Sequence, residues 1–371
     1  MKRLSLGVRS RIKYTVGALF TERATPAVSS NTFFVWEPCS HSHAEVVPGY
    51  VKYLLDLGFD VSVLITPQRL DEGLFSRFTH PRLTVNRLTQ SAIIGYFKEH
   101  GLSNARGVLI TTARKIGAKE SYKSEYALFA DRTRGQKVLL VEHDVKRPAD
   151  SGSIDTNVIT LRKVNYRGVA TTMVNPHFFG TVDITAKNTD IVSFITVGAL
   201  RARRRNSSLL VDTVTKLHDG GIHNFKIAVI GRGSLRGIPP HLHRYFDIKG
   251  RVDFVQLYAA VEEADFFLPL LDPDNPLHER YSTTGTSGSF QLIYGFAKPC
   301  LIAEKFAVPN GFNAENSVVY TGNADLARHM IDAINMGRTE YRSMQQALQA
   351  LATSIYDESL ANLRQLTREQ T

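Results

Sequence analysis

Cysteine and tryptophan are scarce in this chain of 371 residues, which contains two cysteines and one tryptophan. Cysteines as far apart as Cys39 and Cys300 provide neither a disulfide framework nor a four-cysteine zinc site. The sequence also lacks any run of about 18 uncharged apolar residues, which excludes a typical membrane-spanning helix. Hydrophobic residues still make up 43% of the chain, enough to build the cores of globular domains.

Acidic residues are outnumbered by basic ones, and the formal net charge is +10. A basic protein favours anionic partners such as phosphorylated metabolites, nucleic acid or an anionic membrane surface. Residues 1–28 are predicted to be a basic flexible or amphipathic lead, because residues 1–24 hold six basic residues and one acidic residue. Such a segment can rest on anionic lipid. We expect a cytoplasmic protein, with a peripheral position on the inner face of the membrane as one option.

Short apolar strands alternate with helical patterns along most of the chain. The run Thr32–Trp36 is followed by apolar residues at helical spacing between Val46 and Leu57, and then by a second apolar run at Val61–Thr66. This strand–helix–strand order is typical of a parallel α/β sheet. A second alternation begins at Val192–Val197, after a polar connection.

The sequence therefore predicts an α/β protein with two doubly wound, Rossmann-like domains that face each other across a cleft. The expected division is the lead at 1–28, a first domain at 29–180, a second domain at 187–340, and a helical segment at 341–371 that packs back towards the first domain. Within the second domain, Val252–Val255 is expected to be extended and Leu257–Glu263 helical. Sheets of this kind bind ligands at the carboxyl ends of their strands, which directs attention to the cleft.

Arginines cluster after the strand Val192–Val197, just before a predicted helix. The candidates for binding an anion there are Gly198, Arg203, Arg204 and Arg205. Guanidinium groups pair with phosphate oxygens in a bidentate manner, and the N–H groups at a helix start add further donors. A solvated run of charge or an RNA-contacting patch is the alternative interpretation.

Two glycine-containing segments add to this pattern. The first precedes the helix Phe290–Phe296 and consists of Thr286, Ser287, Gly288 and Ser289. Small residues allow close approach of the backbone to a ligand, and their hydroxyl and N–H groups donate to phosphate. The second is Gly231-Arg232-Gly233, which follows a strand but lacks the third glycine of the dinucleotide fingerprint.

Histidines follow two of the predicted strands of the first domain. His143 stands at the end of one strand, and His43 lies in the loop after Thr32–Trp36. Histidine exchanges a proton near neutral pH, so both are candidates for a catalytic role, with a structural role as the alternative. His41 and His43 lie two residues apart without a second ligand pair, and no metal site is expected.

Several of these elements, taken in order, resemble the GT-B glycosyltransferases, especially the glycosyltransferase family 4-like group. The matching segments are Val197-Gly198 with Arg205-Asn206, Ile227–Gly233, Gly250-Arg251-Val252 with Leu257-Tyr258, Ala264-Asp265, and Ser287–Ser289 with Lys298-Pro299. They cover most of the second half of the chain. His143-Asp144 adds weaker support from the first half.

The resemblance implies that the second domain holds a nucleoside diphosphate sugar as co-substrate, without a cofactor, and that the first domain holds the acceptor. Arg205, or Arg203 or Arg204, would bind the diphosphate together with Thr286–Ser289. Gly198 and Gly231 would lie beside the donor, and Arg251, Val252 and Leu257 would border its base. His143 would face the reacting sugar.

One departure from the family concerns carboxylates. Many retaining members carry a pair of glutamates in the donor helix, and the corresponding positions here are Thr284 and Leu292. Glu279 is the expected substitute, and both full activity and the anomeric outcome are left open.

The resulting hypothesis is a metal-independent hexosyltransferase that transfers a sugar to a glycan or lipid-linked acceptor in polysaccharide or glycolipid biosynthesis. Fixed arginines and helix N-termini would stabilise the leaving diphosphate, so the hypothesis requires no metal. A catalytically silent nucleotide-sugar or glycan-binding partner and a sugar-nucleotide 2-epimerase are the alternatives. A nucleic-acid partner is not expected, since no known binding module is present.

Overall fold

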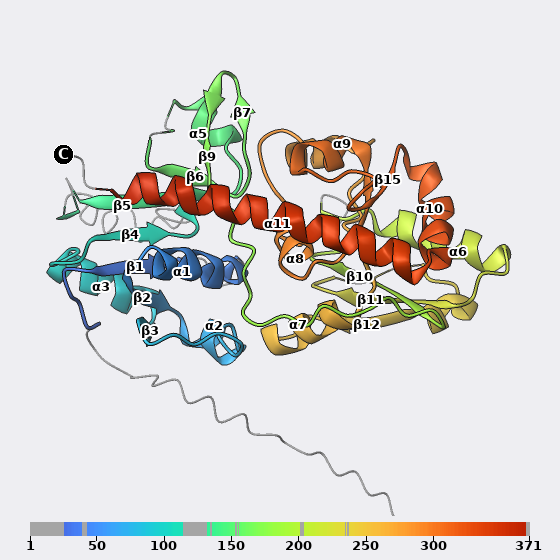
Figure 1. The fold of residues 1–371 in the computed structure, drawn as a ribbon, viewed down its shortest axis with the longest axis horizontal. Coiled ribbons are helices and arrows are strands. Elements are labelled where there is room, and N and C mark those ends of the chain that lie inside the picture. The colour runs from blue at the N-terminus through green and yellow to red at the C-terminus, as the bar shows by residue number, and fades with distance from the viewer. Residues whose placement is uncertain are drawn as a thin grey trace, which may run out of the picture.

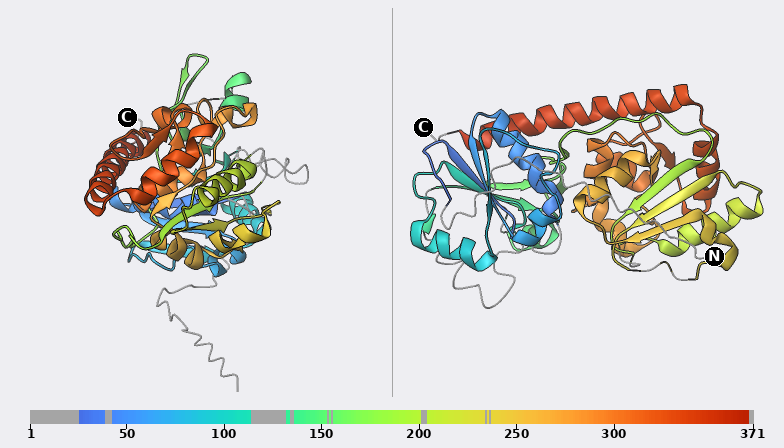
Figure 2. Two further views of the ribbon diagram at one scale, coloured as in Figure 1. Left: turned by 90° about the vertical axis from the view of Figure 1, so that its right-hand side faces the viewer. Right: turned by 90° about the horizontal axis from the view of Figure 1, so that it is seen from below.

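The computed structural model describes residues 26–38, 43–113, 132–133, 136–152, 154, 156–200, 204–233, 235 and 237–368. These residues form two α/β lobes that lie side by side, with one long helix running along both (Figures 1 and 2). Most of the predicted lead, residues 1–25, lies outside the described part of the chain, as does Arg203.

The first lobe is built on a parallel sheet with the strand order β3-β2-β1-β4-β5-β6-β9. Its strands are β1 (Thr32–Trp36), β2 (Asp60–Ile65), β3 (Leu83–Arg87), β4 (Gly107–Ile110), β5 (Lys137–Glu142), β6 (Val158–Thr160) and β9 (Thr172–Met173). Its helices are η1 (Ala44–Val46), α1 (Val47–Asp56), α2 (Pro67–Asp71), α3 (Gln90–His100) and α5 (Lys146–Asp150). A hairpin of β7 (Asn165–Tyr166) and β8 (Val169–Ala170) projects beside α5 (Figure 1).

Both faces of this sheet are covered, and β1 shows why its sequence is apolar throughout. Phe33 and Val35 enter one hydrophobic core, while the alternate residues Phe34 and Trp36 enter another. Side chains of a strand alternate between the two faces, so a strand with helices on both sides has no polar face.

The second lobe has a parallel sheet with the order β12-β11-β10-β13. Its strands are β10 (Val192–Val197), β11 (Phe225–Ile230), β12 (Phe246–Gly250) and β13 (Phe266–Phe267), and a further parallel pair is formed by β14 (Leu301–Ala303) and β15 (Val318–Tyr320). A bridge between Phe267 and Cys300 connects the two sets of strands. The helical elements are α6 (Ser207–Asp219), η4 (Pro240–Tyr245), α7 (Phe254–Glu263), η5 (Pro276–Tyr281), α8 (Gly288–Gly295), α9 (Glu304–Ala307), η6 (Val308–Asn310), η7 (Asn323–Asp325) and α10 (Leu326–Asn335).

Helix α11 (Arg338–Thr367) starts on the second lobe and ends on the first (Figure 2). At its beginning, the hydroxyl of Tyr341 donates to the carbonyl of Asp265 beside β13, over 2.7 Å. Further along, the hydroxyl of Ser359 accepts from the backbone N–H of Asn175 over 2.9 Å. The amide of Asn362 donates to the carbonyl of Met173 in β9, also over 2.9 Å. The helix therefore supplies hydrogen bonds to both lobes.

One local expectation is wrong. The segment Val252–Val255, expected to be extended, contains the start of α7, because the side chain of Asp253 caps that helix by accepting from the N–H of Gln256 over 2.8 Å. The neighbouring strand is Phe246–Gly250 instead. Its side chains are largely exposed, so it carries no buried apolar run.

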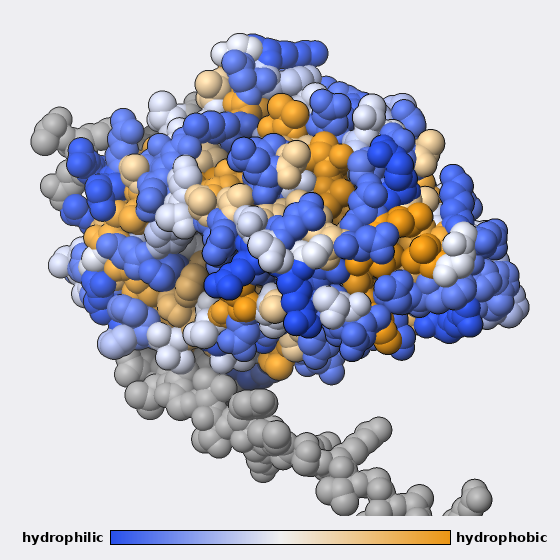
Figure 3. All heavy atoms as spheres, turned by 45° about the vertical axis from the view of Figure 1, so that its right-hand side comes forward, coloured by the Kyte–Doolittle hydropathy of each residue, from blue (hydrophilic) through white to orange (hydrophobic). Residues whose placement is uncertain are grey.

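The surface is mixed in character. Figure 3 shows apolar patches between charged and polar side chains on the face that it presents. Among the described residues, the large apolar side chains that stay exposed are Ile184, Ile191, Ile248, Val255, Leu277 and Val308. None of the described helices combines the length and the apolar character needed to cross a membrane.

Candidate functional site

The carboxyl ends of β10 and β11 meet through two glycines. Gly198 and Gly231 both have positive φ angles, of 133° and 147°. A Cβ on Gly231 would lie 1.8 Å from the carbonyl oxygen of Gly198, and a Cβ on Gly198 would lie 2.9 Å from Nη2 of Arg205. The two predicted donor-binding residues therefore approach each other so closely, where β10 and β11 end, that neither position has space for a side chain.

Arg205 is buried behind these glycines and connects β10 to α8. Its Nη2 donates to the carbonyl of Val197 over 2.8 Å and to the hydroxyl of Ser289 over 2.7 Å. Its Nε has no partner among the described residues. Burial lowers the pKa of this guanidinium, but an arginine in a protein stays charged. A positive charge therefore lies next to the start of α8.

The start of α8 offers donors to an anion. Ser287 caps the helix, with its hydroxyl accepting from the N–H of Ser289 over 3.4 Å. The backbone N–H groups of Ser287 and Gly288 have no acceptor within the described part of the chain. Thr286, by contrast, donates its N–H to the carbonyl of His143 over 3.3 Å. Unpaired N–H groups at a helix start carry the positive end of the helix dipole.

The first lobe contributes two histidines, His143 and His43, beside the segment that precedes α8. Nε2 of His143 lies 2.8 Å from the carbonyl oxygen of Thr111, so Nε2 carries the hydrogen and Nδ1 is left as an acceptor. The ring of His43 lies 4.3 Å from that of His143, between centroids. Burial, and to a lesser extent His43, lowers the pKa of His143 to about 3. The structure thus brings two predicted catalytic residues together, with His143 neutral at pH 7.

Glu45, on η1, belongs to this cluster although it is not among the predicted site residues. Its Oε1 lies 3.2 Å from the position that a Cβ on Gly288 would take, so the carboxylate lies beside the first residue of α8. Burial raises its pKa, and backbone hydrogen bonds to the carboxylate and the charge of Arg69 offset this in part. The sequence gives little indication of this role, since Glu45 is recognisable only as an acidic residue two positions after His43, in the loop after a strand.

The two lobes contact each other directly beside α8. Asp144 and Gly285 form an antiparallel β-bridge, and the N–H of Val145 donates to the carbonyl of Thr284 over 2.9 Å. The hydroxyl of Thr284 donates to Oδ1 of Asp144, also over 2.9 Å. Thr284 and Leu292, at the positions of the family's glutamates, are both buried. No carboxylate stands at either position, and Asp144 approaches the first one from the other lobe.

The residues expected to border a base lie at the start of α7. Nη2 of Arg251 pairs with Oε1 of Glu72 over 2.7 Å. The carbonyl of Glu72 accepts from the N–H of Phe254 over 2.8 Å. Val252 and Leu257 are half-buried and pack against the core. This region is therefore linked to the first lobe just after α2.

Two other predicted residues are associated with η5. Nη1 of Arg204 donates to the hydroxyl of Tyr281 over 3.1 Å. The carboxylate of Glu279 is about half exposed and pairs with Lys305 over 2.6 Å. No described contact connects Glu279 with His43 or His143, so the structure does not bring this carboxylate to the histidine pair.

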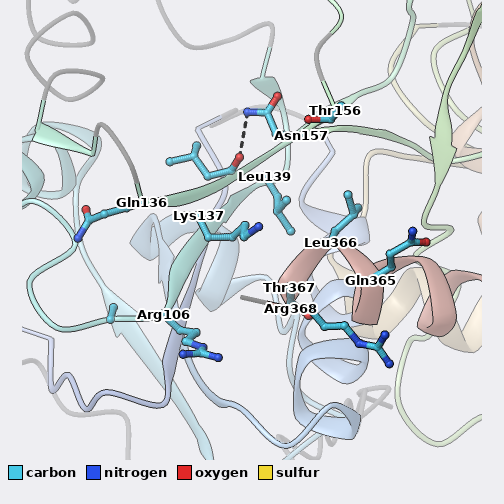
Figure 4. A pocket seen from close by; sticks show the side chains of 12 residues that line it. Arg106, Gln136, Lys137, Leu139, Thr156, Asn157, Gln365, Leu366, Thr367 and Arg368 are labelled. Atoms are coloured by element: carbon cyan, nitrogen blue, oxygen red, sulfur yellow. Dashed lines mark hydrogen bonds between the residues drawn. The ribbon is translucent and has the colours of Figure 1, made fainter. Parts of the chain in front are cut away.

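A cavity of about 850 Å³ lies elsewhere, at the opposite edge of the first sheet. Figure 4 shows Arg106, Lys137 and Arg368 around it, with the end of α11 forming one side. Arg106 and Lys137 flank the amino ends of β4 and β5. Ligands of parallel sheets bind at the carboxyl ends, where the two lobes meet, so the size of this cavity does not make it the candidate site.

The fold is similar to those of solved glycosyltransferases. AviGT4, involved in avilamycin A biosynthesis, gives a TM-score of 0.56 at 15% identity, over 90% of this chain and 98% of that one. Anabaena Alr3699/HepE in complex with UDP-glucose gives 0.55 at 12% identity, over 90% and 98%. WaaG, involved in lipopolysaccharide biosynthesis, gives 0.50 at 11% identity, over 88% and 97%. No protein-family model and no curated protein sequence matches the chain.

These similarities extend over almost the whole length of each solved chain, and the parallel order of both sheets agrees with them. The fold expected from the sequence motifs is confirmed: the chain has the GT-B architecture of two Rossmann-like domains facing across a cleft.

Proposed function

We propose that this protein is a glycosyltransferase that moves a sugar from a nucleoside diphosphate sugar to a glycan or lipid-linked acceptor. The observation that carries the proposal is the anion-binding arrangement at the start of α8. The unpaired N–H groups of Ser287 and Gly288 lie there, next to the buried charge of Arg205. The solved HepE structure of similar fold holds UDP-glucose, which supports a nucleotide-sugar donor.

In the proposed reaction, the bond between the anomeric carbon and the donor diphosphate breaks, and the acceptor oxygen bonds to that carbon. Negative charge grows on the leaving diphosphate, where the α8 N–H groups and Arg205, with Arg203 and Arg204, stabilise it without a metal ion. Arg251, Val252 and Leu257 border the base, and Gly231 allows close approach of the backbone. Nδ1 of His143, assisted by His43, accepts a hydrogen bond from the acceptor hydroxyl, whose proton passes to the leaving diphosphate as the new bond forms. Glu279 is the carboxylate proposed in place of the family's glutamates.

For the acceptor, the proposal is that the protein is a hexosyltransferase that acts in polysaccharide or glycolipid biosynthesis. It also includes a peripheral position on the inner face of a membrane, supported by the basic residues of the lead. Deleting residues 1–27 is expected to lower the fraction of the protein bound to anionic vesicles and to leave donor binding unchanged. Equal vesicle binding by the full and shortened proteins would contradict the membrane part.

The donor proposal is tested by thermal denaturation with UDP, GDP, CDP and ADP. A ligand at about 100 times its dissociation constant stabilises a protein by about 2.7 kcal/mol, a shift of several degrees. We expect one nucleoside diphosphate to raise the melting temperature, and the corresponding nucleotide sugars are then screened for transfer to glycan and lipid acceptors. A shift with single-stranded RNA alone would contradict the proposal.

A second candidate is a catalytically silent nucleotide-sugar or glycan-binding partner. The observation that favours it is the replacement of both family glutamates by the buried residues Thr284 and Leu292. Binding of a nucleoside diphosphate without turnover, over a broad set of donors and acceptors, would distinguish this candidate from the transferase. An altered sugar formed without any acceptor would instead indicate the epimerase.

A further inference from the structure

A carboxyl side chain lies where the negative charge of the proposed donor would lie. Oε1 of Glu45 lies 3.2 Å from the Cβ position of Gly288. Gly288 is the first residue of α8, and its N–H is without an acceptor in the described part of the chain. The Glu45 carboxylate thus lies at the positive end of that helix.

A second observation concerns a buried polar side chain on the same helix. Gln291 follows Gly288 by three residues and therefore lies on the same side of α8. It is 1% exposed, and neither its amide oxygen nor its amide nitrogen has a partner among the described residues. Buried polar atoms normally find partners, so these two unpaired atoms are expected to have a ligand as their partner.

Groups from several elements lie close to Glu45. His43 lies in its own loop, His143 follows β5, Arg69 comes from α2, and Tyr258 comes from α7. All four interact electrostatically with the Glu45 carboxylate or bond to it through the backbone. Burial also raises its pKa, which reflects the cost of keeping this charge out of water.

We propose that Glu45 occupies the anion-binding start of α8 in the donor-free protein and that the donor diphosphate takes its place there. The inference rests on the proposed function for the identity of the anion. Glu45 is then a residue that sets donor affinity, because its negative charge opposes the incoming diphosphate.

The test measures binding of inorganic pyrophosphate and of UDP, GDP, CDP and ADP by calorimetry. The proteins compared are the wild type, Glu45→Gln, Glu45→Asp and the control Glu340→Gln, which removes an exposed charge on α11. Two unit charges about 4 Å apart interact strongly enough that Glu45→Gln should bind pyrophosphate about tenfold more tightly. Glu45→Asp keeps the charge but withdraws it from α8, so a smaller gain is expected, and Glu340→Gln should match the wild type.

The outcomes separate this inference from the proposed function. Unchanged or weaker binding by Glu45→Gln, with a wild type that binds a nucleoside diphosphate, overturns the Glu45 proposal alone. Tighter pyrophosphate binding by the variant, with no nucleoside diphosphate bound by any protein, supports the role of Glu45 and overturns the donor assignment. Absence of any anion binding, with all variants folded by circular dichroism, overturns both.

Discussion

Single side chains in this protein acquire their chemistry from burial more than from their type. His143 lies at the junction of the lobes, and its Nε2 donates a hydrogen bond to the carbonyl of Thr111. Burial lowers its pKa to about 3 and lowers that of His177 to about 4. Both imidazoles are therefore neutral at pH 7. A neutral His143 offers a lone pair to a hydroxyl group, which suits the acceptor-positioning role proposed for it.

The pH dependence of stability follows from these two histidines. In the unfolded chain a histidine binds a proton below about pH 6.5. In the folded protein, His177 binds a proton only below about pH 4 and His143 only below about pH 3, because their pKa values are lowered. Protons thus favour the unfolded state, and stability falls as the pH drops below about 6.5. Urea denaturation should show that His177→Asn reduces this slope by about 1 kcal/mol per pH unit. The same substitution at the exposed His243 should leave the slope unchanged, and equal slopes in all three proteins would contradict the argument.

The place of a residue in the site can be predicted when the residue belongs to a local motif, but not when its place depends on contact between the lobes. Gly198 and Gly231 follow apolar strands, and small residues precede α8, so their positions at strand ends follow from spacing alone. Glu45 has no such motif. Its position beside Gly288 depends on how the first lobe meets α8, which the sequence of neither segment encodes by itself.

At the level of elements, two neighbouring arginines have different environments. Arg205 is buried and connects β10 to α8 through Val197 and Ser289. Arg204 is only half-buried and donates to the hydroxyl of Tyr281. The arginine cluster is therefore divided between a buried link within the second lobe and a side chain nearer to solvent.

This division predicts different results for the same substitution. Arg205→Lys should lower the free energy of unfolding by roughly 2–4 kcal/mol, because an ammonium group cannot replace a fork of guanidinium donors at a buried site. Arg204→Lys should cost about 1 kcal/mol or less and weaken nucleoside diphosphate binding. Denaturation in urea measures the first effect and calorimetry the second. Equal stability losses in the two variants would refute the assignment.

Strands with apolar runs can be predicted from the sequence, whereas a strand with exposed, mostly polar side chains cannot. The expected strands Val192–Val197 and Thr32–Trp36 agree with β10 and β1 residue for residue. Strand β12 lies at the edge of its sheet and has mostly exposed side chains, and the sequence predicts the extended segment at the residues after it instead. An edge strand needs few buried side chains, so hydropathy alone does not find it.

Across the whole molecule, α11 is the element that couples the two lobes. Its residue Thr353 is exposed, in the middle of the helix. Proline at such a position removes a helical hydrogen bond and clashes with the preceding turn, at a cost of about 3 kcal/mol or more. Thr353→Pro should therefore interrupt the connection without touching either core.

Cooperativity of unfolding reports on that connection. Trp36, the single tryptophan, lies in the core of the first lobe, so its fluorescence follows that lobe alone, while circular dichroism follows both. In the wild type the two urea transitions should coincide, and in Thr353→Pro they should separate. Thr353→Ala is the control, in which they should still coincide. Separate transitions in the wild type would contradict the coupling.

The path of α11 also sets an order for folding during synthesis. The N–H of Asn175 and the carbonyl of Met173 receive their partners from Ser359 and Asn362. Ser359 is made 184 residues after Asn175, when the second lobe has already been translated. The lobe that is translated first thus keeps one edge unfinished until the helix arrives, and a nascent chain released before α11 presents that edge to chaperones and proteases.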